Sequence, residues 1–349
     1  MKKSCNDDGK NNSELIDMDN EAIVALGKTR KFRNFTKKQR VVFAVVFLVC
    51  LAIYLCFGVW FLLKRGEKKE AELKESVIEQ AEKIEDKYGI NIMWGGRSNN
   101  QHVNELMSAP NMTNDEEKIK GTLDGIESIF QKYPDGFFDE LKEDKVSNMK
   151  NDFIDVYLCD SIISSNDVAD VVTGGSSGFY YKCSGAYILL DVNQEKNFSH
   201  IISHEIFHIM DSQIGTVSFF NEGINDELGD SIDFRWIKCN PDGYEYLKFG
   251  NNQDEIHVFD SDLPYDINTE KIENVYFVNK YAQLSDQEDR AETLSFLIAC
   301  DDADDLPESY NRPHVKEKAK LIVDMIDDTF DCVDDNAYWA RMYHEKYGD

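Results

Sequence analysis

One short segment combines two histidines and a glutamate at a spacing that could do chemistry. His204, Glu205 and His208 form HEIFH within NFSHIISHEIFHIMD, residues 197–211. Residues four apart lie on one face of an α-helix, so both imidazoles can bind one ion while the carboxylate lies beside it. Such a pattern is typical of zinc hydrolases, in which the glutamate serves as a general base. The alternative is that both histidines are hydrogen-bonded core residues.

A catalytic zinc site normally has three protein ligands, and two acidic segments could supply the third. Glu288 and Glu292 are four apart in YAQLSDQEDRAETLSFLI at 281–298, a segment that we predict to be a helix with a buried face. Glu222, in FFNEGINDELGD, is a competing candidate. Glu288 is favoured because a second inward-facing carboxylate and Tyr281 accompany it.

Two further side chains of the HEIFH segment have open roles. Asp211 could accept the proton of a ligand imidazole, as carboxylates behind metal ligands commonly do, or it could be a surface acid. His200 lies four residues before His204 and could be a third imidazole ligand. Its place in the first helical turn favours a capping or surface role.

Together, HEIFHIMD and YAQLSDQEDRAE resemble the bacterial gluzincin zinc metallopeptidases of the anthrax lethal factor and Pro-Pro endopeptidase type. The resemblance implies an α+β, zincin-like domain with a small mixed sheet, an HExxH active-site helix and a second helix that carries a glutamate. It implies one catalytic Zn²⁺ and these roles: His204, His208 and Glu288 as ligands, Glu205 as general base, Tyr281 as oxyanion stabiliser, and Glu292 as a carboxylate behind the ligands.

The same resemblance extends over residues 150–300. It implies that the strand around 180–192 is a sheet edge that pairs with an extended peptide substrate. The segment 209–280 is then an insertion that borders the cleft.

The elements that must position these residues can be predicted from their patterns. Residues 67–88 have the apolar stripe of a helix, which Gly89 ends, and INIMWGG reads as a short strand. Residues 116–145 are helical around a YPDG turn at 133–136. The runs 152–163 and 178–192 predict strands, with a glycine-rich loop at Gly174, Gly175 and Gly178 between them.

An uncharged run of 23 residues, 41–63, is long enough to span a bilayer as a helix. Seven Lys and Arg residues precede it and four follow closely, which favours a cytoplasmic amino terminus. The predicted order is a disordered cytoplasmic tail at 1–40, a transmembrane helix at 41–63, a helical stalk or first domain helix at 64–88, and an extracytoplasmic metallopeptidase domain at 89–349.

Charge and cysteine content exclude other classes of protein. The formal net charge of −28 disfavours nucleic acid as a partner. The acidic run 301–305 lacks the spacing of a calcium loop and reads as solvated. Five cysteines follow the span without a CxxC pair, which argues against a disulfide scaffold but leaves a Cys159–Cys183 bridge open; they are Cys159, Cys183, Cys239, Cys300 and Cys332.

The sequence therefore predicts a membrane-anchored zinc endopeptidase that cleaves extracytoplasmic proteins or peptides. A catalytically inactive cell-surface binding or sensor protein of the same fold is the alternative, although a base beside the metal argues against it. A cytoplasmic enzyme with reversed topology is a second alternative. The oligomeric state and the cleavage preference do not follow from the sequence.

Overall fold

The computed structural model describes residues 36–97, 102–103, 106, 108–143, 152–164, 171–172, 174–180, 183–194, 197–221, 232–246 and 275–348. Contacts divide the chain into two compact units, Met1–Lys69 and Glu70–Asp349. The predicted tail at 1–40 lies mostly outside the described residues, as do Glu222 and most of the predicted insertion at 209–280.

Helix α2 (Lys37–Tyr88) contains the uncharged run at 41–63. Its large apolar side chains are exposed along this run, and the helix is long and apolar enough to cross a membrane. Since a helix rises 1.5 Å per residue, about 20 apolar residues cross a hydrocarbon core of about 30 Å. The predicted membrane helix thus corresponds to one observed helix of suitable length and composition.

The last turns of α2 belong to the unit Glu70–Asp349. Val77, Ala81 and Ile84 are buried in its hydrophobic core, on the apolar stripe that the sequence showed. Glu85 fixes the end of the helix, because its Oε1 accepts a hydrogen bond from the Ile92 amide at 2.7 Å. Gly89 then leaves the helix with a φ of 63°, as predicted.

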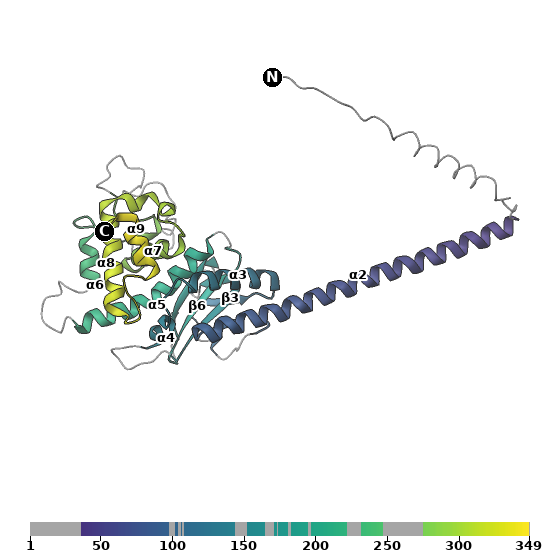
Figure 1. Ribbon diagram of the computed structural model, residues 1–349, viewed down its shortest axis with the longest axis horizontal. Coiled ribbons are helices and arrows are strands. Elements are labelled where there is room, and N and C mark those ends of the chain that lie inside the picture. Colours follow the sequence, from purple (N-terminus) through teal and green to yellow (C-terminus); the bar gives the residue numbers. More distant parts are fainter. Residues whose placement is uncertain are drawn as a thin grey trace, which may run out of the picture. The chain divides into compact units, whose positions relative to one another are not determined.

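A mixed sheet of six short strands forms the centre of this unit (Figure 1). Its strands are β1 (Asn91–Met93), β2 (Ser108–Met112), β3 (Phe153–Ser164), β4 (Val171–Val172), β5 (Gly175–Phe179) and β6 (Gly185–Asp191). The main order is β1-β3-β6-β5, with β1 and β6 parallel to β3 and β5 antiparallel to β6, while β2 and β4 pair antiparallel with β3. A mixed α+β fold with a small sheet is confirmed.

Two predictions for the sheet are wrong. The run 178–192 is not one strand, because β5 ends at Phe179 and β6 begins at Gly185. β6 is also not an edge, since it lies between β3 and β5 with every side chain buried. The predicted glycine loop contributes the edge strand β5, in which glycines leave room for close neighbours: a Cβ on Gly178 would lie 3.0 Å from the Tyr187 hydroxyl.

Helices cover the sheet and extend beyond it. They are α3 (Glu116–Phe130), α4 (Phe137–Lys142), α5 (Phe198–Asn221), α6 (Ile232–Lys238), α7 (Asp286–Ala299), α8 (Pro313–Thr329) and α9 (Tyr338–Tyr347). The predicted turn at 133–136 separates α3 from α4, where Gly136 has a φ of 83°. Figure 1 shows α5 running between the sheet with α3 and α4 and the group α7, α8 and α9.

A buried charged cluster joins α6, α7 and α8. Asp289 of α7 accepts hydrogen bonds from Lys318 Nζ at 2.5 Å, from Tyr246 Oη at 2.8 Å and from Trp236 Nε1 at 2.9 Å. Lys318 is fully buried and its ammonium lies 4.1 Å from the Phe277 ring centroid. Three donors and an aromatic face replace the water that these two charges lose.

No disulfide joins the described cysteines that follow the span. Cys159 is buried on β3, and Cys183 lies in the bend before β6. The Cys159–Cys183 bridge that the sequence left open is absent. Cys183 Sγ instead lies 3.5 Å from His102 Nδ1.

Candidate metal centre

α5 carries three histidines four residues apart. His200, His204 and His208 therefore form a single stripe along this helix, which faces α7. The rest of α5 is held in the core by apolar side chains such as Ile202, Ile206, Phe207 and Met210. Because the helix is packed on several sides, its polar stripe is enclosed; His204 is only 6% exposed.

α7 presents a matching stripe. Ser285 caps this helix by accepting a hydrogen bond from the Glu288 amide at 3.1 Å, which fixes Glu288 in the first turn. Glu292 and Ser295 follow four and seven residues later on the same face. The predicted single helix over 281–298 is therefore divided, with a 3₁₀ turn at Tyr281–Gln283 ahead of the cap.

The two stripes meet in antiparallel order. His208 lies beside Glu288, His204 lies between Glu288 and Glu292, and His200 lies beside Glu292 and Ser295. The pairing follows from two helices that pack side by side, since residues at i and i+4 are one turn apart on each.

Three potential ligand atoms converge at one end of these two facing stripes. His204 Nε2 is 3.0 Å from His208 Nε2 and 2.9 Å from Glu288 Oε2, and His208 Nε2 is 3.5 Å from the same oxygen. Atoms held at about 2.1 Å from one tetrahedral zinc ion would be about 3.4 Å apart. The structure therefore brings together the three residues predicted as ligands, at separations close to those of a metal site.

The polar atoms at this point fit a cation. Glu288 Oε2 is buried and lacks a hydrogen bond of regular geometry to any described residue, although His204 Nε2 lies close to it. Burial alone would raise the pKa of Glu288, yet the close imidazoles of His204 and His208 hold that pKa at about 2, so the carboxylate is anionic. Two imidazoles and a carboxylate are the donor set of many catalytic zinc sites.

Glu205 lies next to the convergence point and faces the sheet. Its Oε2 accepts a hydrogen bond from the Ser177 hydroxyl of β5 at 2.7 Å. The backbone of Gly175 in the same strand also lies against Glu205, because a Cβ at Gly175 would be 2.7 Å from Glu205 Cγ. Burial raises the pKa of Glu205, although the charges of His204 and His208 act in the opposite direction.

Tyr281 lies beside the imidazole of His204. Its ring centroid is 5.8 Å from that of His204, and 40% of the residue is exposed. Desolvation of the phenol oxygen, together with the carboxylate of Glu288, raises the pKa of Tyr281, so the phenol keeps its proton. Asn279 positions this turn, since its Oδ1 accepts from the Ala282 amide at 3.0 Å while its Nδ2 donates to Glu292.

Comparisons with known proteins add one distant likeness. No family model and no curated protein matches this chain. A crystal structure described as a "putative zinc-binding metallo-peptidase", from Bacteroides caccae, is similar over 80% of this chain and 93% of that chain, with 14% identity and a TM-score of 0.40.

The remaining candidates from the sequence have other surroundings. Asp211, expected beside a ligand imidazole, instead accepts two hydrogen bonds from the Arg290 guanidinium, at 2.7 and 2.8 Å. It is three residues after His208, so it faces α7 one turn beyond the site. His200 is neither a capping nor a surface residue, because its Nε2 lies 3.1 Å from Glu292. Glu222 lies outside the described residues.

Sequence analysis missed the contributions of Ser177, Gly175 and Asn279. Ser177 and Gly175 belong to a segment that reads as a turn, and only the pairing of β5 with β6 brings it over Glu205. The signal that could have found them is the alternation of small residues in GGSSG just before a buried strand. Asn279 lies two residues before Tyr281 and had no periodic pattern to mark it.

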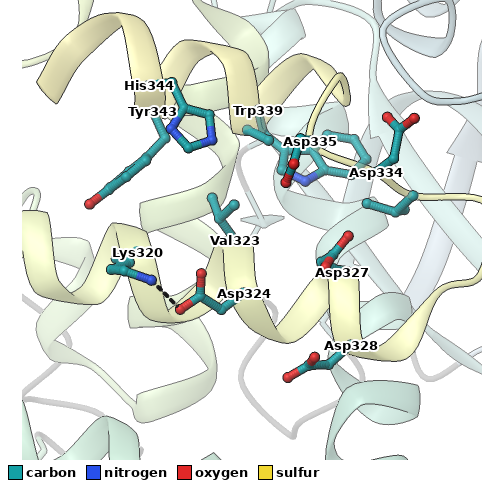
Figure 2. A pocket seen from close by; sticks show the side chains of 12 residues that line it. Lys320, Val323, Asp324, Asp327, Asp328, Asp334, Asp335, Trp339, Tyr343 and His344 are labelled. Carbon is teal, nitrogen blue, oxygen red and sulfur yellow. Dashed lines mark hydrogen bonds and ion pairs between the residues drawn. The ribbon is translucent and has the colours of Figure 1, made fainter. Parts of the chain in front are cut away.

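A separate acidic cleft lies between α8 and α9 (Figure 2). It has a volume of about 390 Å³ and is lined by Asp324, Asp327, Asp328, Asp334 and Asp335. Lys320 pairs with Asp324 at 2.6 Å. Desolvation and the surrounding carboxylates raise the pKa of Asp327. Among the described residues, the groups of ligand atoms within 4.8 Å of one another lie on α5 and α7 and not in this cleft.

Proposed function

We propose that this protein is a membrane-anchored, zinc-dependent endopeptidase that hydrolyses peptide bonds in extracytoplasmic proteins or peptides. The observation that carries the proposal is the convergence of His204 Nε2, His208 Nε2 and Glu288 Oε2 within 3.5 Å. The buried carboxylate of Glu205 and the phenol of Tyr281 both lie close to these groups. Such a set of roles is what hydrolysis of an amide requires.

The ion would be held by His204, His208 and Glu288. When bound, zinc supplies Lewis acidity and lowers the pKa of a coordinated water to about 7. Glu205 takes up the proton of the attacking water and later delivers it to the leaving amine.

Two other side chains complete the chemistry. The protonated phenol of Tyr281 donates a hydrogen bond to the oxyanion that forms from the scissile carbonyl. Ser177 orients Glu205 through its hydrogen bond to Oε2, so the base is aimed before substrate arrives.

The substrate is an extended polypeptide that adds to the free edge of β5. β5 pairs with β6 on one side only, among the strands that the structure describes. Gly175 and Ser177 of this strand contact the general base directly. A peptide paired along β5 by main-chain hydrogen bonds would therefore pass the site.

The span at 41–63 anchors the enzyme. The Lys and Arg residues that precede it favour a cytoplasmic amino terminus, which leaves the unit Glu70–Asp349 outside. The substrates are accordingly cell-surface or secreted polypeptides.

Digestion of a peptide library by the detergent-solubilised full chain tests the proposal. We expect cleavage that stops on chelation and returns with Zn²⁺. Glu205→Gln should bind one zinc per chain but lose at least about 100-fold in kcat, because the base is gone. Glu288→Gln should lose zinc itself, whereas Glu222→Gln, which removes the competing acid, should keep it.

The binding-protein alternative gives a different result. It requires peptides to be retained but not cut, with no difference between Glu205→Gln and the parent. Zinc loss from Glu222→Gln instead of Glu288→Gln would overturn the ligand assignment.

A further inference from the structure

Glu292 is a buried carboxylate that lies between two imidazoles of α5. Its Oε1 is 2.8 Å from His204 Nδ1, and both of its oxygens are 3.1 Å from His200 Nε2. Asn279 Nδ2 also donates to it. Although burial raises the pKa of a carboxyl group, hydrogen bonds from His200 and His204 hold the pKa of Glu292 well below its usual range.

The ring of His200 is oriented at both nitrogens. Ser295 Oγ, which donates to the Glu292 backbone carbonyl at 3.1 Å, lies 3.1 Å from His200 Nδ1. Because an ionised carboxylate can only accept hydrogen bonds, the contacts of His200 Nε2 with both oxygens of Glu292 place a ring proton at Nε2. The Phe296 ring, with its centroid 4.2 Å from that of His200, keeps the imidazole in place.

His204 connects Glu292 to the proposed metal centre, because its two ring nitrogens face different groups. Its Nε2 points to Glu288 and His208, so its Nδ1 is left to face Glu292. A neutral imidazole that binds a metal through Nε2 carries its proton at Nδ1 and donates it to a neighbouring acceptor. The orientation of Glu292 therefore sets the tautomer and the ring plane of a ligand.

His200, His204 and Glu292 also place their ligand atoms within 4.8 Å of one another, as a metal site would. A second ion there would need His204 Nδ1 while Nε2 binds the first ion, which requires a fully deprotonated imidazole ring. A proton on Nδ1, which lies 2.8 Å from Glu292 Oε1, needs no such deprotonation. The geometry thus favours a hydrogen-bonded relay over a second ion.

We propose that His200 is a positioning residue of the metal centre, which acts through Glu292 on His204. The proposal rests on the zinc site proposed above. His200 fixes the Glu292 carboxylate from the side away from the metal, and that carboxylate aligns the ligand imidazole. Removing the Nε2 donor should therefore weaken zinc binding although His200 touches neither metal nor substrate.

The test measures zinc affinity of the full chain in detergent by competition with a chromophoric chelator, and records the visible spectrum of the Co²⁺-loaded protein. His200→Phe keeps the ring volume and removes the donor, so we expect zinc affinity to fall about 10-fold and the Co²⁺ bands to shift. His200→Gln can still donate an amide N–H to Glu292 and should stay within about threefold of the parent.

Two further variants make the result specific. His200→Asn has the same amide on a shorter side chain that cannot reach Glu292, so it should behave like His200→Phe and serves if the latter fails to fold. His314→Phe removes an imidazole stacked on Tyr276 of the same unit, away from the ligands, and should leave zinc affinity unchanged.

The possible failures are distinguishable. Parental zinc affinity and Co²⁺ spectrum in both His200→Phe and His200→Asn would overturn the positioning role while leaving the zinc site intact. Two zinc ions per parent chain, one of them lost in His200→Phe, would overturn it in favour of a second metal site. A parent that binds no transition metal would overturn the proposed function, and the role of His200 with it.

Discussion

Gly175 places the backbone of β5 against the side chain of Glu205. The three heavy atoms nearest to a Cβ at this position would all belong to Glu205: Cγ at 2.7 Å, Oε1 at 2.8 Å and Cδ at 3.0 Å. Cγ is near the root of the side chain, so it cannot move without carrying the carboxylate. The hydrogen bond from Ser177 also resists that movement.

Gly175→Ala should therefore disable catalysis without removing the metal. A displacement of the base by about 1 Å can cost about 100-fold in rate, and we expect kcat to fall by that order with one zinc still bound per chain. Gly121→Ala is the matched control, because nothing lies within 4 Å of a Cβ at Gly121. Parental kcat in Gly175→Ala would contradict the contact.

The residues that could be predicted are those whose roles depend on local spacing. HEIFH and the pair Glu288 and Glu292 follow from helix periodicity, which converts a separation of four into a shared face. Which acid faces which imidazole depends on tertiary packing, which local spacing does not determine. Asp211 has the spacing of a carboxylate behind a ligand, yet Arg290 of α7 takes both of its oxygens.

At the scale of elements, α7 is held from two sides. Its stripe with Glu288 and Glu292 faces α5, while Asp289 accepts hydrogen bonds from Lys318 of α8, Trp236 of α6 and Tyr246. This buried cluster fixes the rotation of α7 about its own axis. The position of Glu288 therefore depends on the charged pair of Asp289, the next residue, with Lys318.

Breaking this pair at one end should be costly. Lys318→Met leaves the carboxylate of Asp289 buried without its cation, and we expect the free energy of unfolding to fall by about 3–5 kcal/mol. Lys320→Met, two residues away, removes an exposed pair with Asp324 and should change it by less than about 0.5 kcal/mol. Denaturant titration of both variants measures the difference, and equal effects would refute the cluster's role.

The sheet contains a second buried acid, whose titration should make the stability of the protein depend on pH. Asp155 of β3 is 1% exposed and accepts hydrogen bonds at 2.7 Å from both Asn91 and Tyr180. Burial raises the pKa of Asp155, despite these bonds, a weaker one from Tyr157 and the nearby charge of His102. An acid whose pKa is higher in the folded state contributes most below its unfolded value, about 3.9, and loses that contribution as pH rises through the folded pKa.

Asp155→Asn removes this titration, since an amide is neutral throughout. The stability of the parent relative to Asp155→Asn should therefore be greatest near pH 4 and should decline towards pH 7. Urea midpoints at pH 4, 5.5 and 7 measure the trend. A difference that does not change with pH would show that Asp155 titrates alike in both states.

Element boundaries show why sequence reasoning was only partly right about the sheet. β3 was predicted almost to the residue, because a long run of branched and aromatic residues fits a strand paired on both sides. β5 was missed, since Gly175, Ser176, Ser177 and Gly178 have turn propensities that pairing with β6 overrides. Its place at the edge depends on topology, which spacing does not encode.

At the scale of the whole molecule, α2 belongs to two environments. Its uncharged run at 41–63 is exposed, whereas Val77, Ala81 and Ile84 are buried in the core of the unit Glu70–Asp349. The boundary between the two units falls within the helix, after Lys69. A cut at this boundary should separate membrane attachment from folding, and a cut at the end of α2 should not.

We therefore expect the fragment 70–349 to be recovered without detergent and to unfold cooperatively, while the full chain sediments with membranes. The fragment 89–349 lacks Val77 and Ile84, whose burial contributes about 3–6 kcal/mol together. That is comparable to the net stability of a domain, so this fragment should be unfolded or aggregated.

Ile84→Ala within 70–349 offers a graded check, with an expected loss of about 2–5 kcal/mol in the free energy of unfolding by denaturant titration. A stable fragment 89–349 would show that the last turns of α2 are dispensable for the fold, and membrane-bound 70–349 would place an anchor outside the span.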